Sequence, residues 1–390
     1  MTQKNNKISW NEIPGYIFLI AFFCYIIDGL ITWSELSYIP FFVIVAKIML
    51  YFSVTLVGIK ILCTKYSHSY FFITLIILLF DFIFLEVTNH TYKDVFIIIL
   101  FIVGAQNVKF DKVIKVYVVT VIIAMIGFYL LVKLNLVMDV TYARDGSYRH
   151  SFGFVYPLSV GSYALFSGLS ILYLTGGKKF TSYWKKIFAT IILLILFWLS
   201  YKYYVARNVS VILLLSILVE SFPSLIKPFN NKAFTIVSIP IIALMNFVLP
   251  KLYSINYNAF YSLNKVLSGR LALERIAVQN YPVKAFGQYI PQVGVAGNPN
   301  IIQWNYFYID SSFFRLLLMY GSLIFFLWII SYMIVVSKTT SKDPLLCLIL
   351  VLISVYGSFD NSMIVLYFNP FMLAILSDVR ERDKKEIIER

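Results

Sequence analysis

The sequence predicts an all-α membrane protein, a polytopic bundle of about 12 transmembrane helices. Of its 390 residues 60% are hydrophobic and 13% are charged, with a mean hydropathy of +0.81, whereas soluble domains contain roughly 45–50% apolar residues. Apolar runs recur from Ile13 to Leu376, and most are about 17–25 residues long, which is enough to cross a hydrocarbon core of about 30 Å as a helix. No regular two-residue alternation predicts a β-barrel.

Polar, glycine-containing or proline-containing segments separate the apolar runs and define the expected spans. These are 13–32, 39–62, 70–86, 94–106, 113–134, 151–175, 187–201, 204–222, 233–250, 308–336, 344–358 and 362–377. The three cysteines, Cys24, Cys63 and Cys347, lie within apolar runs without metal-ligand spacing, so we expect neither a disulfide nor a metal site. Lysines precede the first run and no cleavage site follows a short apolar region, which predicts a retained first helix.

The distribution of lysine predicts that both termini lie in the cytoplasm. Cytoplasmic loops are enriched in Lys and Arg, and each loop on one side of the twelve expected spans contains lysine. These residues are Lys4, Lys7, Lys60, Lys65, Lys109, Lys112, Lys115, Lys178, Lys179, Lys185, Lys186, Lys227, Lys232, Lys338 and Lys342, followed by Arg380, Arg382, Lys384, Lys385 and Arg390 in the tail. The pattern favours an N-in, C-in topology, with a basic cytoplasmic tail at 378–390. The richness of the sequence in Ile, Lys, Asn, Tyr and Phe is typical of an AT-rich bacterial genome, so we expect a bacterial cytoplasmic membrane.

The segment 251–307 divides the chain into spans one to nine (1–250) and spans ten to twelve (308–377). It is far longer than the usual connection of about 4–6 residues. Between Leu263 and Val278, charged residues are interspersed among apolar ones as in an amphipathic helix. We therefore expect one large extracytoplasmic loop, folded as a cap on the outer membrane surface.

Arginines gather on the predicted outer face, against the usual charge bias. They are Arg144, Arg149, Arg207, Arg270, Arg275 and Arg315, and no arginine lies on the inner side before the C-terminal tail. A guanidinium binds phosphate oxygens in pairs and stays ionised. An anionic ligand on this face is therefore expected, and this distribution, despite the net charge of +14, argues against a nucleic-acid partner.

Two of these arginines, Arg144 and Arg149, lie in the aromatic segment 142–157 just before a span. They are candidates for phosphate binding, with tyrosines offering ring faces to sugars. The alternative is a loop that anchors headgroups through an aromatic belt. Arg207 is a further candidate, although an arginine at the mouth of a span also snorkels to headgroups.

Arg270, Glu274, Asp310 and Arg315 are the candidate site residues in and beside the large loop. Arg270 and Arg315 are expected to bind substrate. Arg270 and Glu274 are four residues apart on one helical face, and Glu274 is either catalytic or part of a solvated ion pair. Asp310 precedes the tenth span, where a carboxylate complements a helix dipole or, in a partly dehydrated pocket, acts as a general base.

Lys47 and Asp81 lie inside the second and third expected spans. Charged groups at that depth are expensive and are usually paired. Both lie a comparable distance from the outer end, so we expect an ion pair between these two spans.

The order of these motifs resembles that of Wzy-type polysaccharide polymerases and the related O-antigen ligases. The matching features are an Arg-x-Ser-Phe-Gly-Phe segment (149–154), an arginine turn (206–208), Ser-Gly-Arg (268–270) in a large outer loop, and Asp310-Ser311 before Tyr320-Gly321. Each motif is short, and together they cover roughly residues 140 to 325. Where the ligases have a histidine this chain has Asp310, which favours a polymerase.

The resemblance implies a GT-C-like glycosyltransferase acting at the outer leaflet. A glycan on undecaprenyl pyrophosphate would be the donor and a hydroxyl of the next lipid-linked repeat the acceptor, in exopolysaccharide, capsule or O-antigen synthesis. Arg207 and Arg270 would bind the donor pyrophosphate. Membrane lipids, a flippase and a chain-length regulator are the expected partners. The outer face has no Asp-x-Asp pair or histidine cluster and the chain no glycine-rich phosphate loop, so we expect no metal and no cofactor.

Two other functions fit the sequence. A ligase would transfer the glycan to a different acceptor, so its product would leave undecaprenyl. A flippase or exporter of lipid-linked oligosaccharides would line a central path with cations and show paired repeats. No internal repeat is evident, and the basic residues lie on one face.

Overall fold

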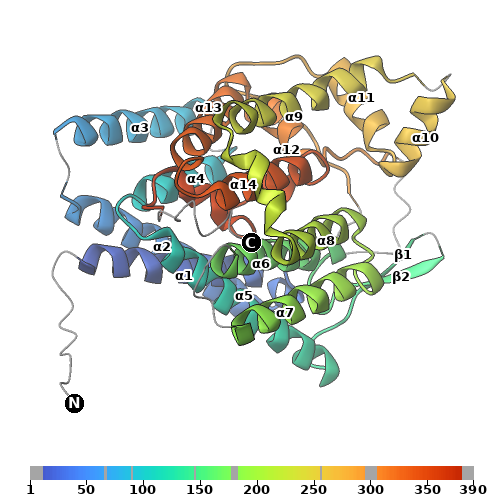
Figure 1. Cartoon of the computed structure of the whole chain (residues 1–390), viewed down its shortest axis with the longest axis horizontal. Coiled ribbons are helices and arrows are strands. Elements are labelled where there is room, and N and C mark those ends of the chain that lie inside the picture. Colours follow the sequence, from blue (N-terminus) through green and yellow to red (C-terminus); the bar gives the residue numbers. More distant parts are fainter. Residues whose placement is uncertain are drawn as a thin grey trace.

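The computed structural model describes residues 12–65, 68–88, 91–144, 146–176, 183–254, 257–294 and 305–379. Eleven helices in these ranges correspond to eleven of the expected spans, and most of them lie side by side (Figure 1). They are α1 (Ile13–Thr32), α2 (Pro40–Cys63), α3 (His68–Val87), α4 (Lys93–Gly104), α5 (Phe110–Lys133), α6 (Pro157–Thr175), α7 (Tyr183–Lys202), α8 (Arg207–Ser221), α9 (Lys232–Leu252), α13 (Ser322–Thr339) and α14 (Pro344–Gly357).

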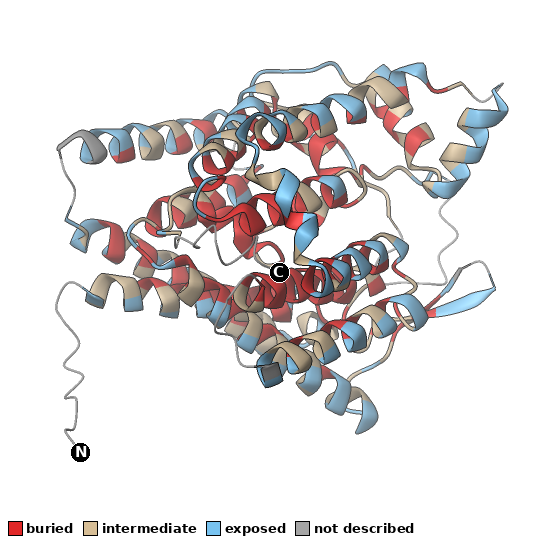
Figure 2. Cartoon of the chain, in the orientation of Figure 1, coloured by how far each residue is buried: buried red, intermediate tan, exposed pale blue. Residues whose placement is uncertain are grey.

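Within the described residues, seven helices are long and apolar enough to cross a membrane, or up to eight if the bent pair of α8 and the 3₁₀ segment η3 (Pro223–Asn230) is one span. Large apolar side chains are exposed on the outward faces of α2, α3 and α7 (Figure 2). Soluble proteins rarely expose such continuous apolar surfaces. This is the architecture of an all-α, multi-pass membrane protein.

Helix α6 lies at the centre of the bundle and is buried along almost its whole length. Its sequence contains small residues at close intervals, and small residues let helices approach closely within a membrane. A Cβ atom at Gly168 would lie 2.4 Å from Leu213 of α8. The close contact explains why α6 has the small-residue composition of an interior helix.

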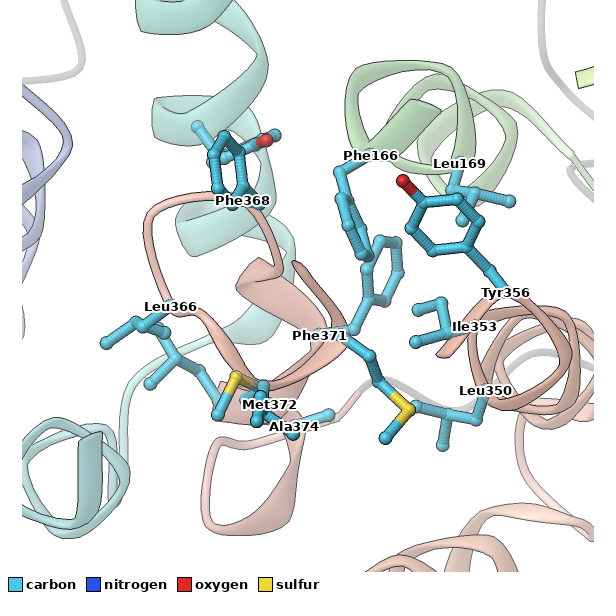
Figure 3. Packing of buried hydrophobic residues seen from close by; sticks show 14 of the residues in the cluster. Phe166, Leu169, Leu350, Ile353, Tyr356, Leu366, Phe368, Phe371, Met372 and Ala374 are labelled. Carbon is cyan, nitrogen blue, oxygen red and sulfur yellow. The ribbon is translucent and has the colours of Figure 1, made fainter. Parts of the chain in front are cut away.

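The prediction of a twelfth helical span at 362–377 is wrong. This stretch contains two 3₁₀ turns, η5 (Asn361–Ile364) and η6 (Pro370–Ile375), because Asn369 and Pro370 interrupt a helix. Asn369 donates to the carbonyl of Met363 over 2.7 Å and accepts from the Phe371 amide over 3.1 Å. Figure 3 shows Phe371 of this stretch next to Phe166 of α6 and Ile353 of α14, while η6 as a whole packs against α4, α5 and α13. Irregular backbone is tolerated at membrane depth only where protein buries it in this way.

The tenth expected span, 308–336, is also not one continuous helix. A short helix α12 (Ser312–Phe314) leads into a π-helical turn η4 (Arg315–Met319), and α13 begins only after Gly321. The segment 284–288 of the large loop crosses this break. Its backbone exchanges hydrogen bonds with it, including Gln288 N to Met319 O at 3.0 Å and Ser322 N to Lys284 O at 3.0 Å. Because the apolar composition continues through the break, hydropathy predicted a single continuous span here.

The large loop contains two helices where the sequence predicts one. These are α10 (Asn258–Val266) and α11 (Arg270–Asn280). Ser268 and Gly269 between them have φ values of 60° and 85°, which end one helix and begin the next in a new direction. A two-stranded antiparallel hairpin, β1 (Thr141–Arg144) and β2 (Ser147–His150), pairs Tyr142 with Arg149 and was not predicted.

The expected ion pair between Lys47 and Asp81 does not form. Lys47 is exposed on α2, and Asp81 is fully buried with neither carboxylate oxygen hydrogen-bonded among the described residues. Although α2 and α3 both pack against α4, Lys47 lies on the outer surface of the bundle and Asp81 lies in its interior.

The helices have two common ends, of which one holds the loop helices and the hairpin (Figure 1). We call this the cap end. There the chain after α1 pairs with the chain before α6, through the amide of Val155 and the carbonyl of Trp33 at 3.1 Å. At the opposite end, Lys60 donates to the carbonyl of Gln106, and the backbone of Asp378 pairs with Val108 and Phe110.

The loop crossing at Gly287 predicts that one added methyl group at this position strongly lowers the stability of the protein. A Cβ at Gly287 (φ 76°) would lie 1.9 Å from the Met319 carbonyl oxygen, whereas a Cβ at Gly146 has the same φ and meets nothing within 4 Å. Gly146→Ala should cost only the left-handed strain of about 1–2 kcal/mol. Gly287→Ala should cost about 1–3 kcal/mol more through overpacking.

The melting temperatures of the two variants in detergent, followed by size-exclusion chromatography after heating, measure this difference. Equal melting temperatures for Gly287→Ala and Gly146→Ala would contradict the described crossing.

Candidate functional site

A cavity of about 400 Å³ opens at the cap end, within the size range of about 300–1,000 Å³ typical of small-ligand sites. Four parts of the chain that lie far apart in sequence enclose it: the end of α1, the hairpin with the start of α6, the large loop, and the turn after α14. Six aromatic rings line it, from Trp33, Tyr142, Tyr156, Tyr306, Tyr308 and Phe368. Its charged lining residues are Arg149, Arg270, Asp310 and Asp360.

Arg270 and Asp310 form the central ion pair of this cavity. Nε of Arg270 lies 2.8 Å from Oδ2 of Asp310, and both side chains are largely buried. The Nε–H is not directed at that oxygen, so the contact is electrostatic and not a well-formed hydrogen bond. Burial alone would lower the pKa of Arg270, but the negative charges of Asp310 and then Asp360 raise it above its ordinary value.

The extended backbone before α12 holds Asp310 in the wall. The Ile309 amide donates to the side chain of Gln292 over 2.8 Å, and its carbonyl accepts from Nε of Arg315 over 2.7 Å. Ser311 donates to Asn246 of α9 over 3.3 Å. These contacts on both sides fix the carboxylate in the site.

Asp360 is a third charged residue of the site, and the sequence analysis missed it. It caps η5 by accepting from the Ser362 amide at 2.8 Å and from the Ser362 hydroxyl. Its backbone carbonyl accepts from Ser312 at 2.6 Å, which ties this turn to α12. Burial raises the pKa of Asp360, the hydrogen bonds from Ser362 oppose this rise, and Asp310 adds to it.

Arg149 reaches the cavity from β2, with only 3% of its surface exposed. Its Nε donates to the carbonyl of Tyr204 over 3.0 Å, and its guanidinium lies 5.5 Å from the ring centre of Tyr156. Its Nη2 atom is buried and has no hydrogen-bond partner among the described residues. A buried donor of this kind is satisfied by an anionic or hydroxylated ligand.

Of the other predicted arginines, Arg207 lies beside the site. It is the exposed first residue of α8 and borders a small void of about 20 Å³ that Arg270, Ser268 and Asp360 also line. Arg144 has its backbone in β1, and its side chain lies outside the described part of the chain.

Arg315 does not line the cavity but stands directly behind it. Its guanidinium lies 4.8 Å from the ring centre of Tyr308, which does line the cavity. Tyr308 therefore separates Arg315 from the cavity interior.

Glu274 is buried on α11, one turn after Arg270, and does not line the cavity. Burial raises the pKa of its carboxyl to about 8, opposed by Arg270 and assisted by Asp310. Because Glu274 lies behind Arg270, the acidic residues with direct access to a ligand in the cavity are Asp310 and Asp360.

The tyrosines expected to face sugars in the segment 142–157 include Tyr142 and Tyr156, which line the cavity. The lining residues that the sequence analysis missed include Trp33, Phe368 and the turn 360–362. One signal was available for this turn. The polar sequence Asp360-Asn361-Ser362 falls between two apolar runs, at the end of the bundle where the arginines were expected.

The site combines a fixed cation with a carboxylate and a ring-lined space. Aromatic faces and scattered hydroxyls suit the apolar C–H faces and the hydroxyls of sugars. Arg270 offers stabilisation of a developing negative charge, and Asp310 offers proton acceptance. Among the described residues, no three His, Cys, Asp or Glu side chains gather to hold a metal ion.

No family model, curated protein or solved structure matches this chain.

The ion pair at the site predicts non-additive mutations. Arg270→Gln should destabilise the protein by about 3 kcal/mol, because it leaves Asp310 buried without its cation. Asp310→Asn should cost less, because Asp360 still neutralises Arg270. The double variant should cost less than the sum of the two.

Melting temperatures of the single and double variants in detergent measure this coupling. Arg275→Gln, on the same helix but bonded to backbone carbonyls of Lys251 and Tyr253, serves as a control that should be additive with Asp310→Asn. Additivity of the Arg270 and Asp310 variants would rule the pair out.

The buried Glu274 predicts a pH-dependent stability. Its pKa is raised from 4.5 to about 8 in the folded protein, so its stabilising effect is complete below pH 4.5 and is lost as the pH rises through 8. The loss is on the order of a few kcal/mol. Glu274→Gln should remove this part of the dependence, and Glu12→Gln, at an exposed position, should not. Parallel melting curves from pH 5 to 9 for wild type and Glu274→Gln would contradict the assignment.

Proposed function

We propose that this protein is a glycosyltransferase that polymerises lipid-linked oligosaccharide repeats at the outer leaflet of a bacterial cytoplasmic membrane. The observation that carries the proposal is the cavity at the cap end, where Arg270 and Asp310 meet among six aromatic rings. The resemblance to Wzy-type polymerases noted from the motif order supports it, because Arg149, Arg270 and Asp310 of those motifs lie in one cavity.

The proposed topology has twelve crossings with both termini in the cytoplasm. The first eleven are helical, and the last is the irregular stretch 361–377, which leaves the cap end at Asp360 and meets the start of α5 at Asp378. The lysines at the end of α2 and at the starts of α5, α7 and α9 then lie on the cytoplasmic side, whereas Lys133, Lys202 and Lys251 lie at the outer ends of α5, α7 and α9. The charges expected on the N-terminal segment and on the C-terminal tail lie outside the described residues.

In the proposed reaction, the anomeric carbon of the donor glycan loses its bond to undecaprenyl pyrophosphate. A hydroxyl oxygen of the acceptor repeat forms the new bond to that carbon. Asp310 accepts the hydroxyl proton, and Arg270 stabilises the negative charge on the departing pyrophosphate. Arg149 and the tyrosines bind the sugars next to the bond that breaks.

Cleavage of the sugar–pyrophosphate linkage of the donor releases the free energy that drives the transfer. The proposal therefore includes no cofactor and no metal. Its substrates are two undecaprenyl-pyrophosphate-linked oligosaccharides. A flippase would supply them, a chain-length regulator would act on the product, and bilayer lipids would surround the bundle.

Purified protein in detergent, incubated with synthetic undecaprenyl-pyrophosphate repeats, tests the proposal. Lipid-linked chains longer than one repeat are the expected product. Arg270→Lys should reduce chain growth at least a hundredfold, because lysine keeps the charge but loses the planar fork. The control Arg275→Lys, on the same helix and outside the cavity, should grow chains as the wild type does.

Three outcomes would overturn the proposal or its assignments. Unchanged repeats would exclude a polymerase. Transfer of the glycan away from undecaprenyl would indicate a ligase. Wild-type chain length from Arg270→Lys would remove Arg270 from the mechanism.

A further inference from the structure

An apolar groove separates α4 from α13, with an enclosed volume of about 90 Å³. One wall is a single face of α4, formed by residues at helical spacings: Val95, Ile98, Ile99 and Ile102. The other is a single face of α13 at the same spacings: Ile324, Leu327, Trp328 and Ser331. The floor is formed by Leu316, Tyr320, Ile364 and Ile375.

The groove runs along the helices and begins at the cap end. Each wall covers two turns, or about 10 Å at 1.5 Å per residue. Both helices start at the cap end, since Tyr92 before α4 donates to the carbonyl of Gln288 in the large loop and α13 starts at the loop crossing. Only Ser331 and the hydroxyl of Tyr320 interrupt its apolar lining.

Arg315 stands between the groove and the cavity. On one side its guanidinium faces the ring of Tyr308 in the cavity wall. On the other, its charge acts on Tyr92, opposing the burial that raises the pKa of this tyrosine to about 12, and the Tyr92 ring lies 5.0 Å from the Tyr320 ring of the groove floor. The same two chain segments, 308–320 and 361–364, line both spaces.

Arg315 also has unused binding capacity. Its Nε donates to the Ile309 carbonyl, its Nη2 is buried without a hydrogen-bond partner, and no carboxylate pairs with it among the described residues. It differs in this from Arg270, whose charge Asp310 neutralises. Arg315 lies in the π-helical turn η4, and such turns are frequent at functional sites.

We propose that the groove between α4 and α13 binds the polyisoprenyl chain of the lipid carrier, with its first phosphate at Arg315. The inference rests on the proposed function, since it is the sugar-bearing lipid that must reach both spaces at once. An apolar chain in the groove, a phosphate at Arg315 and a sugar in the cavity are then consecutive parts of one molecule. Arg315 binds the phosphate that is attached to the polyisoprenyl chain, and Arg270 acts at the sugar–phosphate bond that breaks.

Binding of radiolabelled undecaprenyl phosphate to the full chain in detergent tests the inference without requiring catalysis. Leu327→Trp fills the groove and should weaken binding at least tenfold. Leu214→Trp on α8 is the matched control, because it is the same substitution at a side chain of almost equal exposure, 44% against 45%. The control should bind as the wild type does.

Two further arms separate the parts of the ligand. Arg315→Gln should weaken binding of undecaprenyl phosphate at least tenfold and leave binding of undecaprenol, which has no phosphate, unchanged. Excess phosphatidylglycerol should compete poorly. Equal affinities of Leu327→Trp and Leu214→Trp, or full competition by phosphatidylglycerol, would overturn the inference.

The two proposals fail in different ways. Normal binding by the wild type without chain growth would overturn the proposed polymerase and leave the groove assignment standing. Chain growth together with unaltered binding by Leu327→Trp would overturn the groove assignment only.

Discussion

The requirement that every backbone N–H and C=O in an apolar medium has a partner governs this structure. Eleven segments of the described chain meet it as helices, seven of which are long and apolar enough to span a membrane. Two described places meet it otherwise. At Met319–Ser322 the backbone of 284–288 supplies the partners, and after Asp360 the side chain of Asn369 bonds to the backbone of Met363 and Phe371. Both irregular places lie near the cavity, and the non-helical backbone beside them carries Asp310 and Asp360 into its lining.

The balance of charge at the cavity follows from these two places. Asp310 comes from the segment before the break, Asp360 from the turn after α14, and Arg270 from the start of α11. The carboxylates keep the guanidinium ionised in spite of its burial. Glu274, behind them, lowers the local charge by remaining neutral up to a pH of about 8. Arg270 is thus held in position by Asp310 and Asp360, while Glu274 carries no negative charge below a pH of about 8.

The sequence predicts the helices well where hydropathy alone determines them. The expected spans from 13–32 to 233–250 match helices to within a few residues, apart from the late start of α6 at Pro157. Hydropathy fails at 308–336 and 362–377 because both are as apolar as a helix, while Gly321 and Asn369-Pro370 decide the backbone. The predicted Lys47–Asp81 pair fails for a related reason: the sequence gives the depth of a residue in a span but not which spans are neighbours.

For the site, the sequence predicted the charged residues better than their surroundings. Three of the candidate residues from the sequence, Arg149, Arg270 and Asp310, line one cavity. Arg315 and Glu274 lie behind its wall. Of the aromatic lining, the tyrosines of 142–157 were expected. Trp33 and Phe368 were not predictable, since aromatic residues are abundant throughout the chain, and Asp360 was not singled out because it lies in a short loop between two apolar runs.

The irregular stretch 361–376 has a consequence for how the protein is made. A helix enters lipid as a self-contained unit. This stretch instead depends on other helices: Ser362 hydrogen-bonds to Ser162 of α6, and Phe371 packs against Phe110 of α5 and Tyr173 of α6. It has no stable form in lipid before those helices have assembled. Because the stretch follows these helices in the sequence, the ribosome releases it after them, when the surface against which it packs is already synthesised. Order of synthesis and order of assembly therefore coincide in this chain.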